Sequence, residues 1–534
     1  MRRYPRLLLL ALAGCTLTAA VAATRRPNIV LILADDLGYG DLGCYGQTQI
    51  PTPHIDRLAR EGMRFTQFYA GAPVCAPSRN VLMTGQHTGH TQIRGNAKVD
   101  LRPEDITLAQ VLKSAGYFTA LYGKWGLGSE NSAAPPRKKG FDAFFGYLDQ
   151  THAHNYYPSF LVRDEQRVPL RNVVPQEGRY GQGVAATRLD YSHDLIADAA
   201  LTTLARQTSA RPFFLYLAFT LPHANNEKSP DGMEVPDLGA FARTAWPGPE
   251  KGFAAMVARL DRDVGRVLSQ LKAAGLDDNT IVILTSDNGP HREGGHDADF
   301  FNSRGSLRGY KRDLYEGGIR VPFVVRWPGH IGAGQSSDFV GYLGDVMATL
   351  AELAGASPPA HLDSLSFAPT LLGRAAAQPP HEFLYWEFYE GRSAQAVRFG
   401  DWKAVRSPWA PAPSSSTTSP LTARRRRTSP PPIPPRWSAP APGWTKPTSP
   451  PRSGPRRGEK IRRWRARASP AACTAVTPLS CAPCCSPRSW APAPPSAQPH
   501  PPSFPASSTT VPCSCPTSGR SVPRAARSRS ATSP

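Results

Sequence analysis

Two short stretches of the chain carry oxygen-bearing side chains directly after apolar runs. Asp35 and Asp36 follow the apolar run at 29–33, and Asp287 and Asn288 follow a similar run later in the chain. Three carboxylates and an amide carbonyl suit a hard cation such as calcium or magnesium. They do not suit zinc, which prefers nitrogen and sulfur ligands. The two stretches therefore predict one divalent metal site, provided that both runs are strands ending at the same edge of a sheet.

A single cysteine, Cys75, lies in a third stretch whose residues could do chemistry. Pro73 and Pro77 stand two residues to either side of it, and Arg79 adds a permanent positive charge. Most isolated cysteines are small buried hydrophobic side chains. The two prolines argue against a buried regular element here, and a helix is expected from about Asn80. We therefore interpret Cys75 as a reactive side chain near the amino end of that helix, where the helix dipole favours negative charge.

The apolar runs and the segments between them indicate how these side chains are positioned. Unbroken apolar runs are typical of strands covered on both faces of a parallel sheet, and helical periodicity separates them. Open α/β sheets bind ligands at the carboxyl ends of their strands, where the acidic residues lie. We predict an α/β fold with a large mixed, mostly parallel sheet flanked by helices, and a smaller, truncated carboxyl-terminal antiparallel subdomain. The predicted strands are 29–33, 117–122, 211–219, 280–284 and 321–325, and the predicted helices are 54–63, 108–115, 193–206, 253–274 and 346–353.

The charge of the chain is unevenly distributed. The net charge is +21, but 19 of the 62 Lys and Arg residues follow Arg406, together with only one of the 41 acidic residues. The preceding part is therefore nearly neutral, and no nucleic-acid partner is expected for the globular part. The segment after Arg406 is rich in Pro, Ser and Arg and lacks a helical or strand period. It is predicted to be disordered or to be a shifted reading of the gene.

The amino terminus has the pattern of an export signal. Three arginines precede the apolar run at 7–13, which is too short to span a bilayer. Cleavage at the small residues 20–22 would give a periplasmic or secreted protein, whereas the lipobox-like stretch 12–15 would leave a lipoprotein anchored at Cys15. A membrane contact is expected only through that lipidated cysteine. The expected parts are the signal at 1–23, a catalytic α/β domain at 24–375, the start of the smaller subdomain at 376–406, and the tail at 407–534.

Separated stretches between residues 27 and 406 resemble the signatures of the type I sulfatases, the formylglycine-dependent arylsulfatase family of the alkaline-phosphatase-like superfamily. The resemblance lies, in family order, at 75–79 (Cys-Ala-Pro-Ser-Arg), 123–128 (Gly-Lys-Trp-Gly-Leu-Gly), 222–223 (Pro-His) and 307–318, which contains Leu-Arg-Gly and Glu-Gly-Gly. It implies hydrolysis of sulfate esters to sulfate and an alcohol or phenol. The nucleophile would be the hydrate of a formylglycine that a separate maturation enzyme makes from Cys75.

The resemblance also implies roles for individual residues. Lys124, Lys311 and His223 would contact the sulfate, and His223 would protonate the leaving alcohol. Arg79 would hold the hydrate, and Asp287 would accept its proton. The implied metal is calcium, with magnesium as the alternative, and its ligands would be Asp35, Asp36, Asp287, Asn288 and the modified Cys75.

The chain departs from the family pattern at Gly126, because the family commonly has a histidine there that touches the formylglycine. The proton transfer assigned to that histidine is therefore in doubt, and the base for the elimination of sulfate is unassigned in this sequence.

The polar segment that contains His152, His154 and Asn155 is interpreted as part of the substrate pocket, because loops often carry binding residues. Metal binding by the two histidines is an alternative, but no third ligand stands at a recognisable spacing. The substrate would be a sulfated small molecule or glycan. Two other functions remain open: a phosphonate or phosphodiester hydrolase of the same superfamily, and a catalytically impaired sulfate- or glycan-binding protein.

Overall fold

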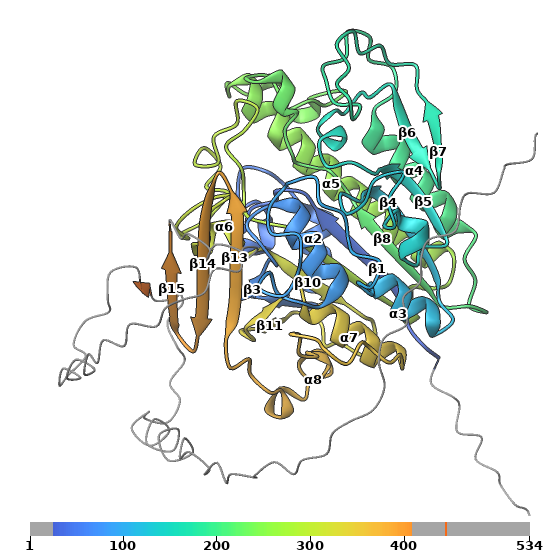
Figure 1. Cartoon of the computed structure of the whole chain (residues 1–534), viewed down its shortest axis with the longest axis vertical. Coiled ribbons are helices and arrows are strands. Elements are labelled where there is room, and N and C mark those ends of the chain that lie inside the picture. The colour runs from blue at the N-terminus through green and yellow to red at the C-terminus, as the bar shows by residue number, and fades with distance from the viewer. Residues whose placement is uncertain (1–24, 408–443, 446–534) are drawn as a thin grey trace, which may run out of the picture. The chain divides into compact units, whose positions relative to one another are not determined.

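The computed structural model describes residues 25–407 and 444–445 (Figure 1). The predicted export signal at 1–23 lies outside the described residues, as does nearly all of the tail predicted from residue 407 onward. In the part of the chain that the structure describes, no helix is both long enough and apolar enough to cross a membrane.

The framework is a ten-stranded mixed sheet with the strand order β11-β2-β10-β9-β1-β8-β4-β5-β6-β7. β1 (Asn28–Ala34) lies between β9 (Thr280–Ser286) and β8 (Phe213–Ala218) and pairs in parallel with both. β4 (Phe118–Lys124) and β5 (Ala143–Tyr147) extend the parallel part beyond β8. Because these five strands run in the same direction, their carboxyl ends lie along one edge of the sheet.

Short strands complete the sheet on both sides of this parallel part. β10 (Phe323–Arg326) pairs antiparallel with β9 and with β2 (Met63–Phe65), which is followed by β11 (Gln335–Ser337). β6 (Phe160–Arg163) and β7 (Gln166–Pro169) form an antiparallel hairpin at the other edge. The predicted large, mostly parallel sheet is confirmed. The sequence did not predict the shortest edge strands, because three or four residues are too few to show a period.

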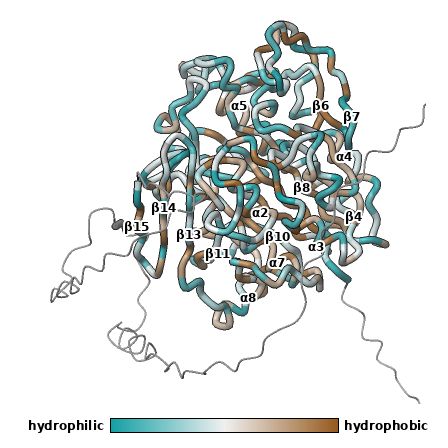
Figure 2. Tube along the Cα trace, in the orientation of Figure 1, coloured by the Kyte–Doolittle hydropathy of each residue, from teal (hydrophilic) through white to brown (hydrophobic). Residues whose placement is uncertain are grey.

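Helices cover both faces of the sheet, as Figure 1 shows, and each face has its own hydrophobic core. The alternation of side chains along a strand separates the cores: Ile29 and Leu31 of β1 face one, and Val30 and Ile32 face the other. Hydrophobic residues accordingly concentrate in the interior in Figure 2. The first core includes residues of α2 (Cys75–Thr84), α3 (Leu108–Ser114) and α7 (Asp345–Ala354), and the second includes residues of α1 (Pro53–Arg60), α4 (Ser192–Ala205) and α5 (Gly248–Ala273).

A separate antiparallel sheet lies near the carboxyl end of the described residues. It contains β13 (Leu384–Glu390), β14 (Arg392–Phe399), β15 (Trp402–Arg406) and β16 (Trp444–Thr445). Its contacts tie it to the large domain, because the indole N–H of Trp386 donates to the Ala70 carbonyl at 2.9 Å and Lys403 pairs with Glu316 at 3.0 Å. The predicted smaller antiparallel sheet is thus present.

The remaining elements are short. They are β3 (Phe68–Tyr69), β12 (Gly341–Tyr342), α6 (Glu316–Ile319), α8 (Ala368–Leu371), and the 3₁₀ turns Gly43–Tyr45, Pro136–Lys139, His152–His154, Asn226–Lys228, Gly239–Arg243, Asp277–Asn279 and Ala375–Ala377.

Candidate active site

The carboxyl ends of β1 and β9 bring the two acidic stretches together. The backbone N–H of Asp36 donates to Asp287 Oδ1 at 3.1 Å, and Asn288 Nδ2 donates to Asp36 Oδ1 at 2.7 Å. Both contacts follow from the parallel pairing of the two strands, which ends at Ala34 and Ser286. The strand ends therefore meet, as the sequence predicted. Asp36 is also held at a φ of 65°, a left-handed conformation that is unusual for a residue other than glycine.

Cys75 lies beside this acidic cluster, with its thiol donating to Asp35 Oδ1 at 3.2 Å. The expectation of an irregular segment before a helix from Asn80 is wrong, because α2 begins at Cys75 itself and the cysteine is fully buried. Pro77 lies in the first turn of the helix, where a missing N–H breaks no intrahelical bond. Burial and the charge of Asp35 raise the pKa of the Cys75 thiol well above its usual value. An unmodified Cys75 is therefore a poor thiolate nucleophile.

Arg79 lies one turn further along α2 and is fully buried. Its Nε and one terminal nitrogen donate to Asp287 Oδ2 at 3.0 and 2.8 Å, and its other terminal nitrogen donates to the Lys124 carbonyl at 2.9 Å. From the sequence, Arg79 was expected to hold the hydroxyl groups of the nucleophile. In the structure its guanidinium joins the ends of β9 and β4 and fixes the carboxylate of Asp287.

Two buried lysines contact the acidic pair that follows β1. Lys124, at the end of β4, donates to Asp35 Oδ2 at 2.7 Å, and Lys311 donates to Asp36 Oδ2 at 2.8 Å. Burial lowers the pKa of both ammonium groups, but the carboxylates outweigh burial and leave both pKa values raised. Both lysines therefore remain charged, and they lie where they could hold an anion.

His223 follows β8 and lies beside Lys311 in the site. Its Nδ1 lies 2.7 Å from the Ala224 carbonyl, which requires a proton on Nδ1, and its Nε2 lies 3.1 Å from the ammonium of Lys311. Burial, followed by the charge of Lys311, lowers the pKa of His223 to about 3. The imidazole is therefore neutral, and its Nε2 lone pair faces a charged proton donor.

Two members of the site, His291 and Glu293, were not predicted from the sequence. Glu293 accepts a hydrogen bond from Lys311 Nζ at 3.0 Å. His291 and Glu293 form with Asp36 a group whose potential metal-ligand atoms lie within 4.8 Å of one another. A second such group contains Asp35, Asp36, Cys75 and His223. His291 and Glu293 follow Asn288 within the same loop, and this short separation was the only signal for them in the sequence.

The donor set fits a hard divalent cation. Asn288 is fully buried, yet its Oδ1 has no hydrogen-bond partner among the described residues, which is rare for a buried amide oxygen. Burial and the neighbouring charge of Asp35 raise the pKa of Asp287 to about 7, because several carboxylates crowd one dry volume. A cation bound to these oxygens would relieve that repulsion and give the carbonyl a partner.

The three predicted substrate-binding residues lie in different environments. The ring of His154 stacks on that of His223 with 4.9 Å between centroids, so this residue borders the site. His152 points into a neighbouring cavity. Asn155 is fully buried, and its Oδ1 accepts from the backbone of Tyr157, which favours a structural role. Of the described residues, neither histidine joins another potential ligand in a metal-binding group of three.

Gly126, the position at which the chain departs from the sulfatase pattern, is constrained in two ways. Its φ is +70°, a left-handed conformation that side chains disfavour. A Cβ atom at this position would lie 2.7 Å from Oε1 of Gln150. Gln150 therefore occupies space beside Gly126, and nothing in the sequence indicated this contact.

The fold and this site define a hydrolase of the alkaline-phosphatase-like superfamily. The family model "Sulfatase" matches residues 27–356, and the model "N-sulphoglucosamine sulphohydrolase, C-terminal" matches residues 309–405. Human arylsulfatase A is 37% identical over 78% of this chain and 81% of its own, and the N-acetylgalactosamine-6-sulfatase of Sus scrofa is 32% identical over 76% of each. The solved structure of Ps i-CgsB in complex with k-i-k-neocarrahexaose superposes with a TM-score of 0.61 at 29% identity, covering 72% of this chain and 85% of that one. The chain belongs to the sulfatase family and is a sulfuric ester hydrolase.

Proposed function

We propose that the chain hydrolyses sulfate esters with a formylglycine made from Cys75 and with one divalent cation. The observation that carries the proposal is the position of Cys75, whose sulfur lies 3.2 Å from Asp35 within the acidic cluster. The raised pKa of its thiol disfavours thiolate chemistry, and this supports a modified side chain. The aldehyde hydrate would supply one hydroxyl for attack on sulfur and a second whose deprotonation releases sulfate.

The cation is proposed to be calcium, with magnesium as the alternative. Asp35, Asp36, Asp287 and Asn288 would hold it, together with the modified side chain at position 75. When bound, it would supply Lewis acidity and hold a sulfate oxygen next to the nucleophile. The orphaned carbonyl of Asn288 supports this ligand set.

The remaining side chains of the site are proposed to bind the sulfate group and to transfer protons. Lys124 and Lys311 bind sulfate oxygens, where two fixed positive charges stabilise the charge of the transition state. His223 is proposed to protonate the leaving oxygen with a proton that its Nε2 takes up from solvent, and the ammonium of Lys311, 3.1 Å from that nitrogen, keeps its charge. Asp287, held by Arg79, accepts the proton of the attacking hydroxyl. The second deprotonation uses a group other than residue 126, because Gly126 has no side chain.

The proposed substrate is a sulfated carbohydrate. Several relatives support this choice, because they are named for a sulfated sugar or were solved with one, including N-acetylgalactosamine-6-sulfatase and the neocarrahexaose complex. A phosphonate or phosphodiester hydrolase is the alternative within the superfamily, and the rates with nitrophenyl sulfate and a nitrophenyl phosphodiester separate the two. A glycan-binding protein without catalysis would show binding by calorimetry and no sulfate release.

The proposed function also requires that Cys75 be oxidised by another enzyme. A formylglycine-generating enzyme is the proposed partner, because the aldehyde cannot arise from Cys75 without oxidation. Export to the periplasm or beyond is the proposed location, either in soluble form or through a lipidated Cys15, and both alternatives concern residues outside the described part of the chain.

The test combines activity with mass spectrometry. The protein is coexpressed with a formylglycine-generating enzyme, and sulfate release from nitrophenyl sulfate is measured for wild type, Cys75→Ala and Cys44→Ala. Cys44 is the other free cysteine of the described residues and lies outside the site, so its variant is the matched control. We expect loss of turnover only for Cys75→Ala, and an aldehyde in the peptide that contains residue 75. Full activity with an unmodified thiol at that position would refute the proposal.

A further inference from the structure

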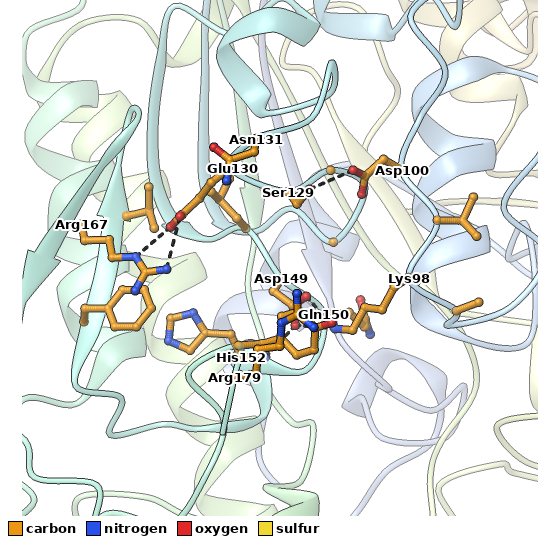
Figure 3. Close-up of a pocket in the computed structure, with 18 residues that line it drawn as sticks. Lys98, Asp100, Ser129, Glu130, Asn131, Asp149, Gln150, His152, Arg167 and Arg179 are labelled. Carbon is orange, nitrogen blue, oxygen red and sulfur yellow. Dashed lines mark hydrogen bonds and ion pairs between the residues drawn. The ribbon is translucent and has the colours of Figure 1, made fainter. Parts of the chain in front are cut away.

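A cavity of about 400 Å³ lies beside the candidate active site (Figure 3). Its volume is in the range of sites that hold small ligands. Two of its walls continue directly from the active site. Ala97 follows Asn96, whose Oδ1 accepts from the backbone of Ala76 at 3.0 Å, and Gly126 stands two residues after Lys124. The wall of the cavity is therefore continuous along the chain with residues in or next to the active site.

Two polar side chains in this cavity lack partners. Gln150 is 8% exposed, and neither its Nε2 nor its Oε1 has a hydrogen-bond partner among the described residues. His152 is 2% exposed, and its Nε2 is likewise without a partner. Buried amides and imidazoles are nearly always hydrogen-bonded, because an unmade bond costs free energy in a dry environment. These two side chains point to a ligand that both donates and accepts hydrogen bonds.

The ionic groups of the cavity largely neutralise one another. Lys98 pairs with Asp149 at 2.6 Å, and Arg167 pairs with Glu130 at 2.9 Å. In Figure 3, Glu130 and Asn131 lie across the cavity from Gln150 and His152. The cavity also contains one further acid and one further base, Asp100 and Arg179. Balanced charges of this kind favour an uncharged ligand over a second sulfate.

Aromatic side chains complete the lining. Tyr180 lies at the wall with the ammonium of Lys98 4.0 Å from its ring centroid, and Phe160 packs against the ring of His152 with 4.5 Å between centroids. Lys98 covers a face of Tyr180 and Arg167 covers a face of Phe160, so these rings give the wall an apolar part, while the amide and carboxylate groups can bond the hydroxyl groups of a sugar ring.

We infer that this cavity binds an uncharged sugar ring adjacent to the sulfated ring, with hydrogen bonds from its hydroxyl groups to Gln150 and His152. The inference rests on the proposed function, because that ring is part of a sulfated carbohydrate substrate. It places sugar recognition on the segment after β5, apart from the residues that act on the sulfate.

The test measures binding of neutral sugars directly. Methyl β-galactoside, methyl β-glucoside and methyl N-acetyl-β-galactosaminide are titrated against the mature, calcium-loaded protein and followed by saturation-transfer NMR. We expect saturable binding of at least one of them in the millimolar range, and at least tenfold weaker binding by Gln150→Leu. Gln207→Leu is the matched control, because this glutamine bonds to the Thr203 carbonyl at the end of α4 and lies outside the cavity. Its affinity should equal that of wild type.

Further measurements keep the result decisive. If Gln150→Leu does not fold, Tyr180→Ala, at the half-buried rim, should weaken the same sugar. Absence of binding to the wild type, or equal binding by wild type and both cavity variants, would overturn the inference and leave only water in the cavity. Hydrolysis of nitrophenyl sulfate is measured on the same samples. Turnover without sugar binding refutes this inference alone, whereas sugar binding without any turnover refutes the proposed function.

Discussion

Replacement of Gly126 by alanine tests whether the backbone and Gln150 together exclude a side chain at this position. The left-handed φ of +70° should cost an alanine about 1–2 kcal/mol. Its Cβ would also lie 2.7 Å from Oε1 of Gln150, so the amide must leave its position at a further cost of about 1 kcal/mol. We expect Gly126→Ala to lower the free energy of unfolding by about 2–3 kcal/mol.

Gly275→Ala separates the two contributions. Gly275 has a similar φ of +65°, but no atom lies within 4 Å of the position that its Cβ would take. This control should therefore lose only the backbone part, about 1–2 kcal/mol. Relative to the Gln150→Ala single variant, the double variant Gly126→Ala with Gln150→Ala should lose about as much as Gly275→Ala does relative to wild type, because the steric partner of the new Cβ is gone.

Urea unfolding monitored by circular dichroism and fluorescence gives these values, provided that the denaturant slope m is the same for all variants. The reasoning fails if Gly126→Ala is no less stable than Gly275→Ala, or if removal of the Gln150 side chain restores nothing. Either result would mean that Gln150 is not held against Gly126 in solution.

Three other predictions follow from particular contacts. Asn288→Leu should raise the calcium concentration needed for a given increase in melting temperature at least tenfold, and a calcium response equal to that of wild type would remove Asn288 from the ligand set. Lys311→Met should lower kcat/KM for nitrophenyl sulfate by about 10²–10³, since it removes a fixed positive charge at the ester. The control is Lys403→Met, which removes a buried lysine paired with Glu316. It should lower the free energy of unfolding but leave the rate per folded molecule unchanged. Burial lowers the pKa of His152 from 6.5 to about 3, although Asp149 raises it and Arg167 and Lys98 add to the lowering. Between pH 6.5 and about 3, His152 binds a proton in the unfolded chain but not in the folded chain. The contribution of the neutral, buried His152 to the free energy of unfolding is therefore complete above pH 6.5 and declines as the pH falls toward 3. Between pH 7 and 4.5, the free energy of unfolding of His152→Phe should therefore fall by about 2–3 kcal/mol less than that of wild type. If the free energies of unfolding of the two proteins change with pH in parallel, His152 is not buried in the neutral state.

The meeting of the two strand ends was predictable because the same pattern, an apolar run followed by acidic or amide side chains, occurs twice in the sequence. β1 and β9 each contain an apolar run, and the acidic or amide residues that follow shortly after these runs are the ones that the sheet brings together, Asp35 and Asp36 with Asp287 and Asn288. A run covered on both faces has to lie in the middle of a parallel sheet, so the location of its carboxyl end follows from composition alone.

The start of α2 was predicted wrongly because proline was treated as a general breaker. Pro77 lies within the first turn of the helix, where the backbone N–H groups have no intrahelical partner in any case. Cys75 could therefore be both helical and buried. The motif predicted Cys75 as a member of the site, and the structure places it beside the acidic cluster, but the local rule misjudged the helix around it.

The contact between Gln150 and Gly126 was beyond the sequence because it depends on the register of the sheet. β4 and β5 pair in parallel, and their extension places the N–H of Gly126 3.0 Å from the Leu148 carbonyl, which brings the two loops together. Asp149-Gln150-Thr151 reads only as a polar turn. A one-residue shift would remove the contact without changing any propensity.

The arrangement of charges explains how the protein could separate sulfate chemistry from sugar recognition. In the active site Lys124, Arg79 and Lys311 each contact a carboxylate of the cluster that is proposed to bind the cation, so the positive groups are already oriented before an ester arrives. In the neighbouring cavity, ion pairs neutralise Lys98 and Arg167. The amide of Gln150 has no hydrogen-bond partner among the described residues. A variant at the first location should therefore change the rate with every sulfate ester, whereas a variant at the second should change only how tightly the attached sugar is held.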